Sequence, residues 1–169
     1  NFAVANNLLF FSGYTSTHGE EIWRSDGTTA GTFMTKELIA GINYPNLPSS
    51  FQVKAVGNTL FFSFYDTVIG DELWKSDGTE AGTVLVKDIA PGVGVGASVS
   101  YMTNFNNQYL VFAGNNSDWT DPNPNGNGTE LWKSDGTSAG TQMIKDLNPA
   151  LGESSSPLNF YQNGFAIFN

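Results

Sequence analysis

The sequence of 169 residues predicts an all-β fold, and more specifically a β-propeller, or part of one, built from four-stranded antiparallel blades. First, an eighteen-residue segment at residues 72–89 returns at residues 130–147, and a looser copy stands first at residues 21–38. Second, a pair of Asn or Gly residues precedes an apolar run in every repeat. Third, these apolar runs do not alternate with polar residues, which is typical of strands buried on both faces.

The first two strands of each repeat are predicted from the turn between them. Asn and Gly tolerate the positive φ angles that two-residue hairpin turns require. In the second repeat, Gly57-Asn58 therefore joins a strand at residues 51–56 to a strand at residues 59–65. The matching turns in the other repeats are Asn6-Asn7, Asn106-Asn107 and Asn163-Gly164.

The repeated segment supplies the third and fourth strands. In the second repeat the third strand carries Leu73-Trp74-Lys75, the fourth spans residues 83–88, and the Asp77-Gly78 pair between them is a turn signal. The tryptophans are expected to pack between blades, the aspartates to accept turn N–H groups, and Lys87 to pair at the surface. The recurring residues predicted to be structural are Trp23, Trp74, Trp132, Asp26, Asp77 and Asp135.

These units predict a single repeat domain over residues 1–169. Its expected parts are blade 1 at about residues 2–38, blade 2 at about 51–89, blade 3 at about 99–147, and the start of blade 4 at about 158–169. A propeller needs about 4–8 blades to close a ring, and three and a half blades do not suffice. We therefore expect further blades of the same parent chain, an expectation that the lack of an initial Met also favours.

Composition limits the classes of function. The formal charge of −9 argues against nucleic acid and against an anionic membrane surface, because both need a basic face. The absence of cysteine excludes a disulfide framework and a thiolate metal site. No apolar run approaches the roughly 20 residues of a membrane span. His18 is the only histidine and is expected to be a solvated loop residue, so no histidine cluster or triad base is expected.

The repeated motif also resembles a known family. ELWKSDGT occurs at residues 72–79 and 130–137, and EIWRSDGT at residues 21–28. On these residues the chain is similar to the ELWxxDGT repeat proteins, which are found in large secreted or surface-attached bacterial proteins. With the flanking hairpins the resemblance covers essentially the whole chain. It implies an extracellular or cell-surface β-propeller-like array, and it supplies no catalytic site.

Function is expected on the connections that differ from repeat to repeat. In an up-and-down sheet these lie on the face opposite the short repeated turns, and loops on a rigid scaffold commonly carry function. We therefore predict a non-catalytic module with a structural or binding role, whose partner is a protein or a glycan. The variable connections are residues 14–20, 38–50, 65–71, 89–98, 115–129 and 147–157.

The alternative function is a secreted carbohydrate-active hydrolase or lyase. Paired carboxylates can hydrolyse glycosidic bonds, and Glu72, Asp77 and Asp88 recur in register in the third repeat. Residues repeated in every blade are more often structural, however, so no catalytic residue is assigned. Acids on the variable connections would distinguish this alternative; they are Glu20, Asp66, Asp71, Asp118, Asp121 and Glu153.

The long connection of the third repeat is the one singular feature. Residues 121–126 match the D-x-N-x-N-G opening of a calcium loop. The position-twelve acid is missing, because Trp132 stands there, and two prolines stiffen the segment, so a plain turn is the alternative. Trp119 is predicted to contact a ligand unless it folds back over the blade edge. The predicted binding residues are Trp119, Asp118 and Asp121; those for calcium, the one cofactor considered, are Asp121, Asn123, Asn125, Asp118 and Glu130.

Overall fold

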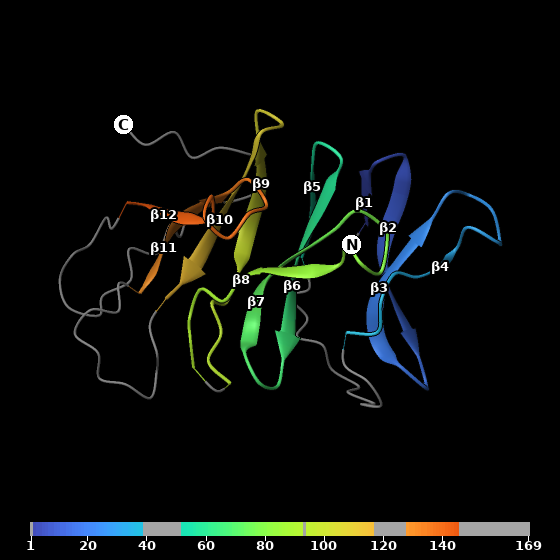
Figure 1. The fold of residues 1–169 in the computed structure, drawn as a ribbon, viewed down its shortest axis with the longest axis horizontal. Coiled ribbons are helices and arrows are strands. Elements are labelled where there is room, and N and C mark those ends of the chain that lie inside the picture. The colour runs from blue at the N-terminus through green and yellow to red at the C-terminus, as the bar shows by residue number, and fades with distance from the viewer. Residues whose placement is uncertain (1, 39–51, 93, 117–127, 146–169) are drawn as a thin grey trace.

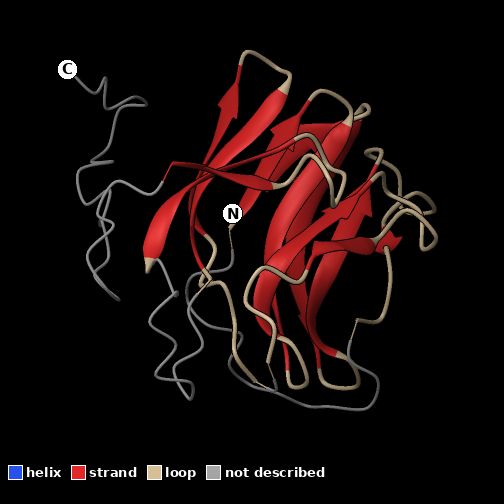
Figure 2. Ribbon diagram, turned by 60° about the vertical axis from the view of Figure 1, so that its left-hand side comes forward, coloured by secondary structure: helices blue, strands red, loops and turns tan. Residues whose placement is uncertain are grey.

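The computed structural model describes residues 2–38, 52–92, 94–116 and 128–145. In this part of the chain the strands form three four-stranded antiparallel sheets, and no segment is helical (Figure 2). Sheet 1 contains β1 (Phe2–Ala5), β2 (Leu8–Thr15), β3 (Gly19–Ser25) and β4 (Phe33–Met34). Sheet 2 contains β5 (Val53–Val56), β6 (Thr59–Asp66), β7 (Gly70–Ser76) and β8 (Val84–Lys87). Sheet 3 contains β9 (Ser100–Phe105), β10 (Tyr109–Asn115), β11 (Thr129–Ser134) and β12 (Gln142–Lys145).

Each sheet is a simple meander, because strands that neighbour in sequence also pair in space. The turns that were predicted from Asn and Gly are present: Asn6, Gly57 and Asn106 all have φ angles between 51° and 57°. The all-β class and the four-stranded units are therefore confirmed. The fourth hairpin, at residues 163–164, lies outside the described residues, and ring closure stays a prediction.

The three sheets stand face to face in chain order, with sheet 2 in the middle (Figure 1). One apolar cluster between sheets 1 and 2 includes Phe10 and Phe62, and a second between sheets 2 and 3 includes Phe61 and Phe112. Phe61 and Phe62 enter different clusters because successive side chains on a strand point to opposite faces. Their exposed fractions are 2% and 0%, so the predicted burial on both faces is correct for sheet 2.

We call the face of a sheet that meets the preceding sheet its leading face, and the opposite face its trailing face. The leading face of sheet 1 carries Phe2, Val4 and Leu9, which are 73%, 65% and 37% exposed. The trailing face of sheet 3 carries Ile144, which is 48% exposed. Two-sided burial therefore does not hold for the outer sheets within the described residues, because no described sheet covers these two faces.

The repeated tryptophans occupy matching positions but are not equally buried. Trp132 is buried, whereas Trp23 and Trp74 are half-buried; Trp74 packs against the cluster between sheets 1 and 2, as expected, but its side chain is not fully buried. The indole Nε1 groups of Trp23 and Trp132 donate to backbone oxygens of Gly13 and Gly114, at 3.1 and 3.0 Å.

Sheet 2 has Phe64 where the other two sheets have these glycines. The Phe64 ring packs edge-on against Trp74, with 5.9 Å between centroids. The buried Nε1 of Trp74 has no hydrogen-bond partner. One residue difference thus exchanges a hydrogen bond for an aromatic contact.

Candidate functional site

The repeated SDGT turn is closed by its own side chains. Oδ1 of Asp77 accepts hydrogen bonds from the backbone N and the hydroxyl of Thr79, at 2.8 and 2.7 Å. The Thr79 hydroxyl in turn accepts from the backbone N of Gly82 at 3.0 Å. The same bonds form in the other two copies, through Asp26, Thr28 and Gly31, and through Asp135, Thr137 and Gly140.

These bonds also set the protonation of the turn aspartates. Hydrogen bonds from the threonine side chain and backbone hold the pKa values of Asp26, Asp77 and Asp135 below the ordinary value. Each carboxylate therefore stays ionised and bound within its own turn. These recurring acids serve the scaffold.

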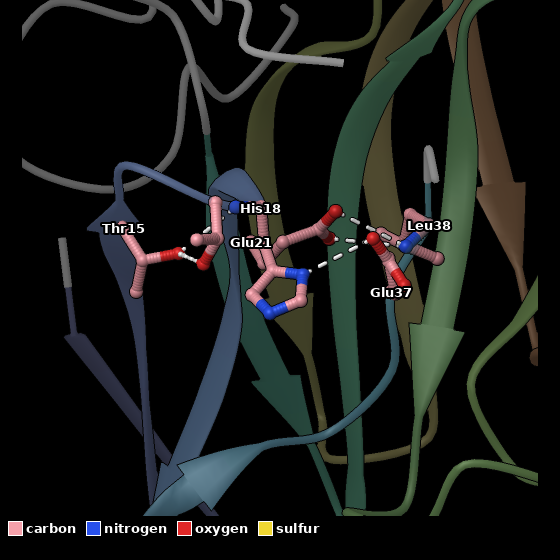
Figure 3. Close-up of polar contacts among 6 residues, drawn as sticks. Thr15, His18, Glu21, Glu37 and Leu38 are labelled. Carbon is pink, nitrogen blue, oxygen red and sulfur yellow. Dashed lines mark hydrogen bonds and ion pairs between the residues drawn. The ribbon is translucent and has the colours of Figure 1, made fainter. Parts of the chain in front are cut away.

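The glutamate that opens the ELW motif fixes the chain where it leaves the fourth strand. The two carboxylate oxygens of Glu72 accept hydrogen bonds from the backbone N atoms of Ile89 and Ala90, at 2.9 and 3.1 Å. In sheet 1 both oxygens of Glu21 accept from the backbone N of Leu38, at 3.1 and 3.2 Å (Figure 3). Sequence reasoning missed this role, although the recurrence of Glu before the third strand was its signal.

Burial raises the pKa of Glu72 to about 7, although the two N–H groups favour its ionised form. The nearby carboxylate of Asp88 adds to the rise because like charges disfavour ionisation. The side chain is 0% exposed, so water cannot replace these partners.

Glu130, one of the predicted calcium ligands, occupies the position of Glu72 in sheet 3 and is also 0% exposed. The other residues predicted for calcium or ligand binding, Asp118, Trp119, Asp121, Asn123 and Asn125, lie outside the described residues. Among the residues that the structure describes, no cluster of three or more His, Asp or Glu side chains could hold a metal ion. Calcium binding therefore stays a prediction.

Basic side chains join consecutive sheets. Nζ of Lys36 donates to the backbone oxygen of Thr83 at 3.1 Å, and Nζ of Lys87 donates to that of Thr141 at 2.9 Å. Nζ of Lys75 donates to the backbone oxygen of Gly136 at 2.7 Å. The expectation that Lys87 pairs at the surface is therefore wrong, because its ammonium group reaches a carbonyl of the next sheet.

The connection between β8 and β9 was predicted to be displayed on the variable face. Most of its apolar residues are instead buried, with Val95, Ala97 and Val99 at 5%, 0% and 2% exposure. Its backbone is also tied down, since Gly94 N donates to Val68 O at 2.9 Å. The apolar residues at every second position were a signal for this burial.

Glycines allow this connection to approach the turn between β6 and β7. Gly70 has a φ angle of 79°, and a Cβ there would collide with the backbone oxygen of Val95. A Cβ at Gly96 would likewise collide with the backbone of Asp71. Burial raises the pKa of Asp71 to about 6, although a hydrogen bond from the backbone of Val99 acts in the opposite direction and lowers it. This part of the variable face is packed scaffold.

In sheet 1 the end that carries the variable connections has partly exposed polar contacts. Nδ1 of His18 lies 3.1 Å from Oε1 of Glu37, and the two side chains are 40% and 35% exposed (Figure 3). The Thr15 hydroxyl also accepts from the backbone N of His18 at 3.1 Å. His18 is therefore more than the solvated loop residue that was expected: it connects the β2–β3 turn to the segment after β4.

An exposed tyrosine stands opposite an acid at the variable end of sheets 1 and 2. Tyr14 pairs with Glu20 across β2 and β3, and Tyr65 pairs with Asp71 across β6 and β7. The tyrosines are 57% and 38% exposed. Asp66, another acid of this face, accepts from the backbone N of Val68 at 2.6 Å and so caps its own turn.

Comparison with known proteins assigns no family to this chain. No family model matches this chain, and none of the curated proteins matches it. A solved α-L-arabinofuranosidase from Clostridium thermocellum aligns with 84% of this chain at 16% identity and a TM-score of 0.30. The chain spans about half of that protein, since 48% of its length is covered. These values are too low to assign a fold or an activity. In the described residues no helix has the length and apolar character needed to span a membrane.

Proposed function

We propose that this chain is a non-catalytic β-propeller repeat module that acts outside the cell or at the cell surface. It holds a protein or glycan partner on its variable connections. One observation carries the proposal: the recurring acids of the repeat are engaged by the scaffold. Asp77 is bound within its turn, and Glu72 is buried against the backbone of the chain that leaves β8.

The variable end of the sheets supplies groups that suit such a partner. Tyrosine combines an apolar ring with a polar hydroxyl, a combination that is common where proteins meet sugars or other proteins. Tyr14 and Tyr65 both present exposed rings, each opposite an acid. The proposed surface therefore consists of Tyr14, Tyr65, His18 and Glu37, together with the long connection at residues 115–129.

That long connection carries the second part of the proposal. Trp119, beside Asp118 and Asp121, would contact the partner, and Asp118, Asp121, Asn123 and Asn125 would order the loop around Ca²⁺, while the buried Glu130 belongs to the scaffold. Titration calorimetry with Ca²⁺ tests this part. We expect saturable binding that Asp121→Ala abolishes and that Asp71→Ala preserves. An unchanged heat signal in Asp121→Ala would exclude the loop as the calcium site.

The partner-binding role is tested by exchanging one connection. Residues 115–129 are replaced by the short connection at residues 65–71, and both proteins are probed on an array of glycans and a panel of extracellular proteins. We expect the exchange to preserve the thermal transition and to abolish the binding seen with the parent chain. Undiminished binding would place the partner elsewhere. Turnover of polysaccharide substrates that Asp71→Asn or Asp66→Asn abolishes would favour the hydrolase or lyase instead.

A further inference from the structure

One buried carboxylate holds both ends of the connection between β8 and β9. Glu72 on β7 accepts hydrogen bonds from the backbone N atoms of Ile89 and Ala90, at 2.9 and 3.1 Å. The backbone of Ala97, near the other end of the connection, also bonds to this carboxylate. Glu72 is 0% exposed, and Ala90 and Ala97 are 1% and 0% exposed. A single dry side chain therefore fixes where this connection leaves one sheet and enters the next.

A second carboxylate and the neighbouring turn complete this arrangement. Asp71, beside Glu72 on β7, receives a hydrogen bond from the backbone of Val99. Between the two ends, Gly94 N donates to the backbone oxygen of Val68 in the β6–β7 turn at 2.9 Å. The connection thus braces the β6–β7 turn, and two adjacent acids hold the connection.

Three carboxylates meet at this point without a basic partner. The third belongs to Asp88, which lies near Glu72 and whose Oδ1 is buried without a hydrogen-bond partner. Nζ of Lys87, the preceding residue, donates instead to the backbone oxygen of Thr141 in sheet 3. Within the described residues, no Lys, Arg or His side chain forms an ion pair with any of the three acids. Because buried like charges repel one another and lack water, the site retains protons.

The groups around these acids do not supply a compensating charge. Residues 89–98 contain no titratable side chain. Asp66 of the β6–β7 turn accepts from a backbone N of its own turn, and Tyr65 lies across the strand pair from Asp71. Burial raises the pKa of Glu72 to about 7 and that of Asp71 to about 6, which agrees with the retention of protons.

We propose that Asp71 and Glu72 form an acid latch. It holds the β8–β9 connection closed while these side chains carry protons and lets it open as they lose them. An ionised Glu72 keeps its backbone donors but lies dry beside the carboxylate of Asp88. Opening the connection exposes these charges to water, which favours the open form once they are ionised. Opening also frees the β6–β7 turn that carries Tyr65, and it does so whether or not the proposed partner binds there.

Sheet 1 offers an internal control, because its third carboxylate is wetter and has a basic partner. Glu37 occupies the position of Asp88, is 35% exposed and lies 3.1 Å from Nδ1 of His18 (Figure 3). Sheet 2 has Ile69 at the position of His18. The backbone N of Leu38, which the matching glutamate of sheet 1 holds, should therefore respond to pH less than the amides of the acid latch.

Hydrogen exchange of individual backbone amides, followed by NMR between pH 4.5 and 8, tests the latch. Rates are corrected for the intrinsic pH dependence of exchange, which gives an opening constant for each amide. The pKa of Glu72 is about 7 in the closed form and 4.5 in an unburied glutamate, so opening releases a proton between these values. The opening constants of Ala90 and Ala97 should therefore rise at least about tenfold per pH unit up to about pH 7 and level off above it.

The parent chain alone decides the first point. The amide of Phe62 in β6 reports global unfolding, and we expect Ala90 and Ala97 to open more readily than Phe62 at every pH. Opening constants equal to those of Phe62 would overturn the inference, because the connection would then open only with the whole domain. A rise at Leu38 as steep as that at Ala90 would also overturn it, since three unpaired acids would not be its cause.

Matched variants identify the groups that release the protons. Glu72→Gln should flatten the rise at Ala90, even where the amide weakens the closed form at every pH. Asp71→Asn should reduce the rise only below about pH 6. Asp66→Asn is the control, because Asp66 caps its own turn and Asn keeps the acceptor, so the rise should stay as in the parent. A rise that persists unchanged in Glu72→Gln would overturn the latch.

Discussion

Sheets 1 and 2 have the same sequence pattern but different surroundings. Phe62 and Phe11 occupy matching positions opposite Trp74 and Trp23, yet Phe62 is 0% exposed and Phe11 is half-buried. Sheet 2 has a neighbour on each face, whereas the leading face of sheet 1 has none among the described residues. The comparison shows that burial here depends on the neighbouring sheet, as in repeat proteins whose stability is a sum of units and interfaces.

The SDGT turn behaves in the opposite way. Its hydrogen bonds have nearly the same lengths in all three sheets, although Gly27 is exposed and Gly78 and Gly136 are buried. The hydrogen bonds that close the turn join residues no more than seven apart, so its geometry needs no neighbour, although lysines of the preceding sheet also donate to backbone oxygens at Thr83, Gly136 and Thr141. The turn is thus set locally and the strand faces are set by packing, and substitutions can separate the two effects.

The largest effect is expected from truncating an aromatic side chain in the middle sheet. Phe62→Ala removes a ring that stacks on Trp74, at 6.4 Å between centroids, and leaves a cavity between sheets 1 and 2. We expect the free energy of unfolding to fall by about 3–5 kcal/mol, the usual cost for a buried phenylalanine. Phe11→Ala, the matched change in sheet 1, should cost less than half as much. Urea denaturation of both variants measures the difference, and equal losses would show that the leading face of sheet 1 is already covered.

The next effect is a dependence of stability on pH in the middle sheet. The pKa of Glu72 is raised to about 7, from 4.5 in an unburied glutamate, so its ionised form is less favourable in the folded state. The contribution of Glu72 to the free energy of unfolding is therefore fully present below pH 4.5 and is lost as the pH rises toward and through 7. At about 1.4 kcal/mol per pKa unit the loss is at most about 3.5 kcal/mol.

Unfolding of the parent chain and of Glu72→Gln between pH 4.5 and 8 measures this contribution. Glu72→Gln should flatten the decline, because the amide does not ionise, although it lowers stability overall by replacing one acceptor with a donor. Asp71→Asn should flatten it by a smaller amount, since the pKa of Asp71 is raised only to about 6. A decline that is as steep in Glu72→Gln as in the parent would assign the dependence to other groups.

Much of the fold could be predicted from the sequence because its signals are local. Asn and Gly at the turns predicted the hairpins, and Asp77-Gly78 predicted the turn of the repeated motif. The hydrogen bonds of Glu72 and Lys87 could not be predicted in the same way. Their partners are backbone groups 17 and 54 residues away, which a side-chain pattern does not identify. The missing hydrogen bond of the buried Trp74 Nε1 could not be predicted either. It follows from Phe64 on the neighbouring strand, which stands where the other two sheets have a glycine.

The candidate site was less predictable than the fold. Their difference between repeats and their place opposite the short turns predicted that residues 89–98 form part of a binding face, but most apolar side chains of that connection are buried beside the β6–β7 turn. Connections can therefore differ between repeats for two reasons: one is exposed for binding, and another packs against a neighbouring turn. The exposed Tyr14 and Tyr65 became visible only when strand register placed both at the same end of their sheets.

A smaller and uniform effect is expected in the repeated turn. Asp77→Ala removes the acceptor of two hydrogen bonds from Thr79, and we expect a loss of about 1–2 kcal/mol, as for a lost helix or turn cap. Asp26→Ala in sheet 1 should lower stability to a similar extent, because its hydrogen bonds are equally local. Thermal unfolding of both variants compares the sheets. A loss confined to sheet 2 would show that the turn, too, depends on its neighbour.

The smallest effect concerns the lysines between sheets. Lys87→Met keeps most of the side-chain length but removes the hydrogen bond from Nζ to the backbone oxygen of Thr141, and a single such bond contributes about 1 kcal/mol. Lys145→Met is the matched change in sheet 3, where the residue is exposed. We expect Lys87→Met to lower the free energy of unfolding by about 1 kcal/mol and Lys145→Met to change it by less than about 0.5 kcal/mol. Equal losses in the two variants would mean that Lys145 makes a contact in the folded chain that stabilises it as much as the bond of Lys87 does.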